Sequence, residues 1–175
     1  GIPTIAYGQL FKEAKRQGVV GLLDGQGMDE AWGGYDYYYK HDGGVVQGTM
    51  HSPVSTKSLT TEFIANADNR LFPNPFESTL QNLQFRDLFY TKIPRALRFN
   101  DRASMMHSTE LREPFLDHRL VEFAFALPRQ FKEHEGVTKF GLRKINEQRL
   151  GSHLALAGKR PLQTPQREWL RGPLK

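Results

Sequence analysis

The stretch VVGLLDGQGMDEAWGGY, residues Val19–Tyr35, holds the strongest fold signal in the chain. An apolar run ends at Leu23, a turn with two glycines follows, and an acidic pair, Asp29 and Glu30, comes next. A short apolar run bounded by turn residues is typical of a buried parallel strand. We therefore predict a buried strand over residues 19–23, then a turn, then a helix that begins near the acidic pair.

The turn Asp24–Gly27 has two interpretations. Gly25 and Gly27 permit positive φ angles and close approach of the backbone to a ligand, and the N–H groups at a helix start bind phosphate. Asp29 and Glu30 would repel a phosphate, so a nucleotide at this turn requires Mg²⁺ between them. The alternative is an ordinary strand-to-helix turn whose carboxylates complement the helix dipole. Spacing alone favours this alternative, because short glycine motifs recur by chance.

Composition and charge narrow the class of protein. A chain of 175 residues, 38% hydrophobic and 25% charged, is typical of one globular domain with a sizeable core. No apolar run approaches the ~20 residues of a membrane span and no signal-peptide pattern is present, so we expect no membrane partner. The absence of cysteine excludes disulfides, Cys-zinc sites and thiol nucleophiles within these residues, and we therefore expect a cytoplasmic protein. The net charge of +5 is carried by scattered basic residues, so we expect no nucleic-acid partner.

Helical periodicity dominates the rest of the sequence. Apolar residues three and four apart predict a helix with Thr4 as its cap and Gly18 as its stop. Further helices are predicted over residues 57–67, 76–90, 91–108, 118–127, 138–150 and 166–170, and Asp117 is predicted to cap the 118–127 helix. Residues 41–58 are rich in Gly, Ser and Thr and predict a mobile loop.

The predicted fold class is therefore mostly α with one short strand. One strand cannot form a sheet, and no second convincing strand follows it. We expect its partners either upstream of Gly1 or in a second copy of the chain, which would make a homodimer. A patch of tyrosines after the turn is predicted to pack on the core with its hydroxyl groups in water: Tyr35, Tyr37, Tyr38 and Tyr39.

Two basic features stand out along the predicted helices. Basic residues at helical spacing share one face of the 91–108 helix: Lys92, Arg95, Arg98 and Arg102. Such a face is usually solvated or paired with acids, and phosphate binding is the alternative. Lys139 falls in the first turn of the 138–150 helix and shares a face with Arg143. A cation is disfavoured by the dipole at a helix start, so this position is unexpected for a purely structural residue.

Four segments, in order along the chain, resemble the C-terminal part of the synthetase domain of glutamine-hydrolysing asparagine synthetases. They are LLDGQGMDEAWGGY (22–35), LRFNDRASMMHSTELREPFLDHRLVEFAFALP (97–128), GVTKFGLRK (136–144) and KRPLQTPQREWLRGPL (159–174). The resemblance implies that residues 1–175 are a single partial domain, the C-terminal portion of an α/β adenine-nucleotide hydrolase-like (PP-loop) synthetase domain. It also implies ATP-dependent amide formation, in which ATP and Mg²⁺ convert aspartate to a β-aspartyl-adenylate that is attacked by ammonia from glutamine.

The same resemblance implies that part of the protein lies elsewhere. The family's pyrophosphate-binding loop, Ser-Gly-Gly-x-Asp-Ser, does not occur in this sequence, and neither does the cysteine of the glutaminase domain. We therefore expect a fragment whose partner is the missing N-terminal part of the same protein. We expect the 175 residues to be inactive by themselves.

Matching of motifs implies a role for each of five residues. Asp24 and Gly25 fall where the family's Ser-Gly contacts the nucleotide, and Asp29 matches an acid near Mg²⁺ and pyrophosphate. Lys139 matches a lysine that stabilises charge developing on phosphate, and a helix start favours the same anion. Gln26 matches a glutamate thought to assist formation or breakdown of the acyl-adenylate. Gln26 is an amide and cannot act as a base.

Two further functions stay open at the level of the sequence. Gln26 and the 41–58 loop are compatible with a synthetase relative that amidates another acid or closes a β-lactam. The missing phosphate loop and the replaced glutamate are compatible with a non-catalytic helical interaction module.

Overall fold

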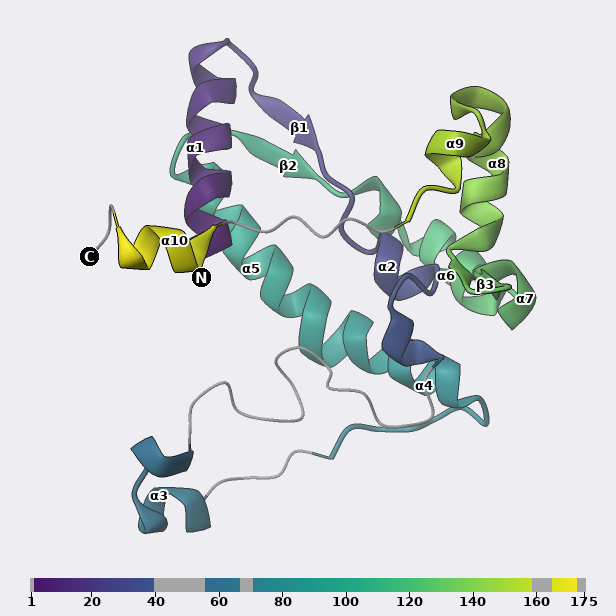
Figure 1. Ribbon diagram of the computed structural model, residues 1–175, viewed down its shortest axis with the longest axis horizontal. Coiled ribbons are helices and arrows are strands. Elements are labelled where there is room, and N and C mark those ends of the chain that lie inside the picture. The colour runs from purple at the N-terminus through teal and green to yellow at the C-terminus, as the bar shows by residue number, and fades with distance from the viewer. Residues whose placement is uncertain (1, 40–55, 67–70, 159–164, 173–175) are drawn as a thin grey trace.

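The structure is a computed structural model that describes residues 2–39, 56–66, 71–158 and 165–172 (Figure 1). Its helices are α1 (Ile2–Arg16), α2 (Met28–Ala31), α3 (Thr61–Ala65), α4 (Thr79–Arg86), α5 (Lys92–Met105), α6 (His118–Ala126), α7 (Arg129–Lys132), α8 (Phe140–Leu150), α9 (Ser152–Ala155) and α10 (Gln166–Arg171). Its strands are β1 (Gly21–Leu23), β2 (Glu110–Arg112), β3 (Glu133–His134) and β4 (Val137–Thr138). The prediction of a mostly helical chain is confirmed. Within these ranges no helix is long and apolar enough to cross a membrane.

The prediction of a single short strand without a partner in the chain is wrong. Strand β1 pairs in parallel with β2, with Gly21 opposite Glu110 and Leu23 opposite Arg112. The chain passes through α2 to α5 between the two strands, and α5 packs against α1 beside them (Figure 1). Strand β2 has the sequence Glu-Leu-Arg, which has no apolar run, so its pairing depends on tertiary contacts rather than on local pattern.

Strand β1 is also shorter and more exposed than predicted. It begins at Gly21 instead of Val19. The Leu23 side chain is 77% exposed, because the sheet in the described residues has two strands only. The buried position predicted for residues 19–23 is therefore wrong for this part of the chain.

Most predicted helices occur, with shifted ends. Helix α1 begins two residues before the predicted cap Thr4, and the predicted 76–90 helix becomes α4 followed by a π-helical turn, Asp87–Thr91. Asp117 caps α6 as predicted, since its carboxylate accepts a hydrogen bond of 3.0 Å from the backbone N–H of Arg119. Of the predicted 41–58 loop, residues 41–55 lie outside the described ranges, and Thr56–Ser58 form a 3₁₀ turn.

The tyrosine patch bonds to the protein rather than to water. The Tyr38 hydroxyl donates to the Asp87 carboxylate at 3.0 Å, and Tyr37 donates to the same carboxylate. Asp87 is fully buried on the π-helical turn, and a buried carboxylate needs such donors. Burial raises the pKa of both tyrosines well above the usual range, so the hydroxyl groups stay protonated and donate. Packing on the core is confirmed, and the prediction of hydroxyl groups in water is wrong.

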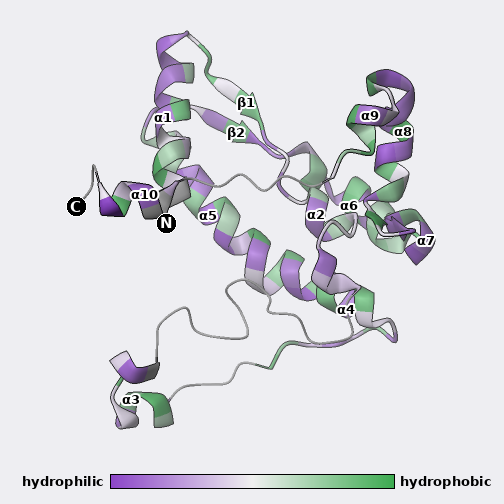
Figure 2. Ribbon diagram, viewed as in Figure 1, coloured by the Kyte–Doolittle hydropathy of each residue, from purple (hydrophilic) through white to green (hydrophobic). Residues whose placement is uncertain are grey.

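Helix α2, which follows the glycine turn, lies at the centre of the hydrophobic core. Ala31 and Trp32 are buried against Ala124 of α6. A buried polar side chain holds α2 from the other side: Gln84 of α4 donates to the carbonyl oxygens of Glu30 and Ala31, each at 2.7 Å. Figure 2 shows hydrophilic and hydrophobic bands alternating along α5, which runs below α2. The turn before α2 is therefore followed by a well-packed element.

Candidate functional site

The turn that joins β1 to α2 is shaped by glycine at two positions. Gly27 has a φ angle of 90°, and a Cβ atom there would lie 2.3 Å from Cδ2 of Leu116. At Gly34 a Cβ atom would lie 1.9 Å from Oδ1 of Asp29. Gly25 is not in the left-handed region, and its nearest neighbour would be Met28 at 4.0 Å. Close packing therefore requires Gly27 and Gly34, whereas the sequence pointed to Gly25 and Gly27.

An ion pair links the turn to a distant part of the chain. The Lys139 ammonium donates to Oδ1 of Asp29 at 2.8 Å, across 110 residues of sequence. Both side chains are largely covered, with exposed fractions of 16% for Lys139 and 26% for Asp29. The structure thus brings together two of the five predicted site residues. The ammonium of Lys139 is a group that commonly binds phosphate, and the carboxylate of Asp29 is a group that commonly binds Mg²⁺.

Lys139 lies just before helix α8 and not within its first turn. Strands β3 and β4 form a hairpin through Thr138, so the helix begins at Phe140. Lys139 has φ 56° and ψ 33°, a left-handed conformation that a residue with a side chain rarely adopts. The Arg143 guanidinium, predicted to share its face, instead donates to the carbonyl oxygens of Thr138, Ala155 and Ala157. Arg143 therefore anchors the chain around Lys139 instead of facing Asp29.

Asp24 is held at the end of β1 by two neighbours. Its Oδ1 accepts a hydrogen bond from the backbone N–H of Gly25 at 2.6 Å, and its Oδ2 accepts one from the Asn100 amide on α5 at 3.1 Å. Both carboxylate oxygens are therefore occupied. The predicted residues Asp24, Gly25 and Gln26 are consecutive on this turn, and Gln26 is partly buried.

One acidic residue at this turn was missed by the sequence interpretation. Glu113 follows β2 directly, and its Oε2 atom is buried without a hydrogen-bond partner among the described residues. Burial, followed by the negative charge of Asp24, raises the pKa of Glu113, and the backbone N–H of Gln26 opposes this shift. No local signal marks Glu113, because it meets the turn only through the pairing of β1 with β2.

The Mg²⁺ site predicted from the resemblance has one protein carboxylate, that of Asp29. Among the described residues, no three His, Cys, Asp or Glu side chains cluster closely enough to hold a metal. Nucleotide-bound Mg²⁺ needs fewer protein ligands, because one or two carboxylates, phosphate oxygens and water complete its shell. Asp29 would supply the carboxylate, and Lys139 beside it would attract the phosphate.

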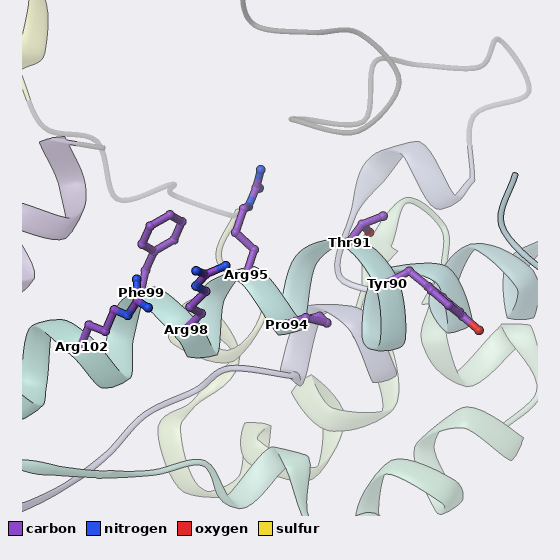
Figure 3. A pocket seen from close by; sticks show the side chains of 7 residues that line it. All are labelled: Tyr90, Thr91, Pro94, Arg95, Arg98, Phe99 and Arg102. Carbon is purple, nitrogen blue, oxygen red and sulfur yellow. The ribbon is translucent and has the colours of Figure 1, made fainter. Parts of the chain in front are cut away.

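A second charged region lies on another face of α5. A cavity of about 510 Å³ is lined by Tyr90, Thr91, Pro94, Arg95, Arg98, Phe99 and Arg102 (Figure 3). The three arginines are exposed and form no ion pair with another described residue. Lys92 is not among the lining residues, since its ammonium lies 3.9 Å from the centre of the Tyr35 ring. The predicted basic face is therefore reduced to three arginines at the cavity.

Comparison with known proteins identifies similar sequences. The family model described as Asparagine synthase matches residues 4–175. Asparagine synthetase [glutamine-hydrolyzing] 3 of Bacillus subtilis is 31% identical over 153 residues, which cover 78% of this chain and 25% of that protein. Asparagine synthetase [glutamine-hydrolyzing] 1 of the same organism is 26% identical over 211 residues, covering 93% of this chain and 33% of that protein.

A third relative comes from an archaeon. The putative asparagine synthetase [glutamine-hydrolyzing] 1 of Methanocaldococcus jannaschii is 27% identical over 135 residues, covering 77% of this chain and 19% of that protein. This chain thus spans a third or less of the length of these relatives. No solved structure matches it.

Proposed function

The chain belongs to the asparagine synthase family, and from this membership we propose that it is part of an ATP-dependent ligase that makes asparagine from aspartate. Residues 1–175 would form a single partial domain, the C-terminal portion of a PP-loop synthetase domain. The observation that carries this proposal is the contact of 2.8 Å between Lys139 and Asp29, because it joins two family-like segments into one charged site.

Each residue around the turn has a role in this proposal. The backbone at Asp24 and Gly25 would lie against the nucleotide, and Asp29 would hold Mg²⁺. Mg²⁺, when bound, neutralises negative charge on the phosphates of ATP. When the nucleotide binds, the Lys139 ammonium would leave Asp29 and contact a phosphate oxygen. One ion pair is then replaced by two interactions, Lys139 with phosphate and Asp29 with Mg²⁺. Gln26 cannot act as a base in this site, because its side chain is a neutral amide.

The reaction has two steps in which charge develops on phosphate oxygens. An oxygen of the aspartate β-carboxylate attacks the α-phosphorus of ATP, and pyrophosphate leaves. Ammonia derived from glutamine then attacks the β-carbonyl carbon of the β-aspartyl-adenylate, and AMP leaves. A cation held at the site stabilises both leaving groups, and Lys139 is that cation in this proposal.

The remaining parts of the site are proposed to lie outside these residues. The pyrophosphate-binding loop and the glutaminase cysteine would come from the N-terminal part of the same protein, which is the expected partner. Because the pyrophosphate-binding loop does not occur in these residues, we expect no ATP–pyrophosphate exchange from the 175 residues alone. Detectable exchange by this polypeptide would contradict the division of the site between two parts.

A related ligase is the second candidate. Gln26 stands where a glutamate is expected, and a changed residue at this position is compatible with another acceptor acid or with closure of a β-lactam. The chemistry of activation is the same in both cases, so Asp29 and Lys139 keep their roles.

The test uses the full-length protein that contains these residues. Pyrophosphate release is measured with Mg²⁺, ATP and ammonia or glutamine, in the presence of aspartate and of alternative acids. Release that depends on aspartate supports the proposal, and release that depends on another acid supports the second candidate. If no acid stimulates release, the enzymatic proposal fails and a helical interaction module becomes the better explanation.

A further inference from the structure

Formation of an amide from an acyl-adenylate and ammonia releases a proton, so the site needs a group that accepts it. Gln26 cannot do this, because a neutral amide is not a base at physiological pH. We propose that Glu113 is this proton acceptor, and that its carboxylate, directly after β2, acts on the ammonia that attacks the acyl-adenylate at the turn Asp24–Gln26. This inference rests on the proposed function, since it assigns the base of that reaction.

The parallel sheet brings Glu113 to the turn. Leu23 and Arg112 are opposite each other as the last residues of β1 and β2, and Asp24 and Glu113 follow them directly. The backbone N–H of Asp24 donates to the carbonyl oxygen of Arg112 at 2.9 Å, which continues the alignment beyond the strands. Ligands of open parallel sheets bind at the carboxyl ends of the strands. Glu113 therefore lies at the edge where a nucleotide or acyl group is expected.

The Glu113 carboxylate also has free accepting capacity. Its Oε2 atom is buried and lacks a hydrogen-bond partner in the part of the chain that the structure describes. A buried oxygen without a donor destabilises a fold, so its presence calls for an explanation. The explanation proposed here is that this oxygen accepts a proton from a substrate nitrogen during the reaction. The raised pKa of Glu113, caused mainly by burial, makes its carboxylate form a stronger proton acceptor.

The other acids near the turn are already engaged. Both oxygens of Asp24 accept hydrogen bonds, from Gly25 and Asn100. Asp29 is paired with the Lys139 ammonium. Glu30 is 3% exposed and accepts a hydrogen bond from the Tyr35 hydroxyl at 2.7 Å. Glu113 is thus the acid at this turn, among the described residues, that has a buried oxygen without a hydrogen-bond partner.

The step balances without any further reactant. The ammonia nitrogen forms a bond to the β-carbonyl carbon, and Glu113 takes one proton from that nitrogen. The bond between the carbonyl carbon and the AMP oxygen breaks, and its electron pair leaves with AMP. Adenylation of aspartate needs no such proton transfer, so the two halves of the reaction depend on Glu113 differently.

The experiment measures these halves separately in the full-length protein. Glu113→Gln keeps the shape of the side chain and removes the base. We expect amide formation from ammonia to fall by about 100-fold, whereas aspartate-dependent ATP–pyrophosphate exchange changes by less than about 3-fold, a small effect for a group outside the transition state. The matched control is Glu110→Gln, because Glu110 lies three residues before Glu113, on β2, but is exposed and paired with Arg112. The control is expected to match wild type in both assays.

Thermal unfolding separates a chemical role from a structural one. Glu113→Gln replaces a poorly solvated carboxylate, so we expect a melting temperature equal to or above that of wild type. If the variant folds poorly, Glu113→Asp is used instead, because it keeps the negative charge but shortens the side chain by one methylene group. The same selective loss of amide formation is expected. A variant with the amide-forming rate of wild type, or an equal loss of both halves in Glu113→Asp, overturns the inference. If the wild-type protein shows no ATP–pyrophosphate exchange with any acid, the proposed function itself fails. That outcome is distinct from a failure of the inference about Glu113.

Discussion

Asn100 and Arg98 are two residues apart on α5 but face different regions of the molecule. Asn100 is 8% exposed and donates to Asp24, at the turn between β1 and α2. Arg98 is exposed and lines the cavity with Arg95 and Arg102 (Figure 3). One helix thus supports both a packed polar site and an open basic surface.

The difference between the two regions is how their charges are held. At the turn, Asp29 has Lys139 at 2.8 Å, and the backbone below rests on the buried Gln84 side chain. The cavity arginines form no ion pair with other described residues, and water can solvate them. Charges fixed by packing are preorganised for chemistry, whereas exposed charges contribute little to either stability or geometry. Substitutions in the two regions should therefore have very different effects.

Removal of the Lys139 ammonium is the strongest test of this comparison. In the full-length protein we expect Lys139→Ala to lower turnover by ~10²-fold or more, because charge on the leaving phosphates loses its preorganised cation. Arg98→Ala is the matched control and is expected to keep wild-type turnover. Steady-state rates with aspartate as acceptor provide the measurement. Wild-type turnover in Lys139→Ala would remove this residue from the mechanism.

The pH dependence of stability tests the buried support below the turn. Lys132 donates to Gln84 at 2.8 Å, and burial lowers the pKa of Lys132 to about 8. Between about pH 8 and the ordinary lysine value of 10.5, the unfolded chain binds more protons than the folded chain. Stability should therefore rise with pH across this window, by up to about 3 kcal/mol.

The reference for that measurement is Lys132→Met. Melting temperatures of wild type and variant are compared between pH 7 and 10.5, so that other titrating groups cancel in the difference. We expect the rise that is due to Lys132 to vanish in the variant. Parallel pH curves would show that Lys132 keeps an ordinary pKa.

Gly27→Ala tests the close packing of the turn itself. A Cβ atom would lie 2.3 Å from Cδ2 of Leu116, at a φ angle of 90° that disfavours a side chain. We expect a loss of about 2 kcal/mol in the free energy of unfolding. Gly8→Ala in α1 is the control, because no atom lies within 4 Å of its Cβ position. An unchanged melting temperature in Gly27→Ala would show that the turn can move.

Replacement of the three cavity arginines by alanine should have the smallest effect. The side chains are exposed and unpaired with other described residues, so we expect the free energy of unfolding to change by no more than about 0.5 kcal/mol per residue. Turnover with aspartate is expected to stay at the wild-type level. A loss of turnover similar to that of Lys139→Ala would show that both faces of α5 serve one site.

Features that depend on near neighbours were predicted well. Helical periodicity located most helices, since residues three and four apart share a face wherever the helix lies. The Asp117 cap was predicted because a carboxylate and a helix start are adjacent in sequence. The same local information placed a turn after residue 23 and a helix near Asp29. Four short motifs were sufficient to indicate the family.

The errors concern contacts between distant residues. Strand β2 escaped prediction because three mixed residues become a strand only beside β1. The tyrosine hydroxyl groups were expected in water because nothing in their own segment reveals Asp87. In both cases the partner is remote in sequence, and local secondary-structure propensity gives no information about it.

The local sequence determined the helices, the glycine turn and the residue types available for chemistry. Tertiary structure alone decided which of these residues meet: Lys139 reaches Asp29 across 110 positions, and β-strand pairing carries Glu113 to the turn beside Gln26. The physical reason is that an ion pair or an unpartnered carboxylate depends on distance and burial. Both quantities arise only when the chain has folded and brought remote segments into contact.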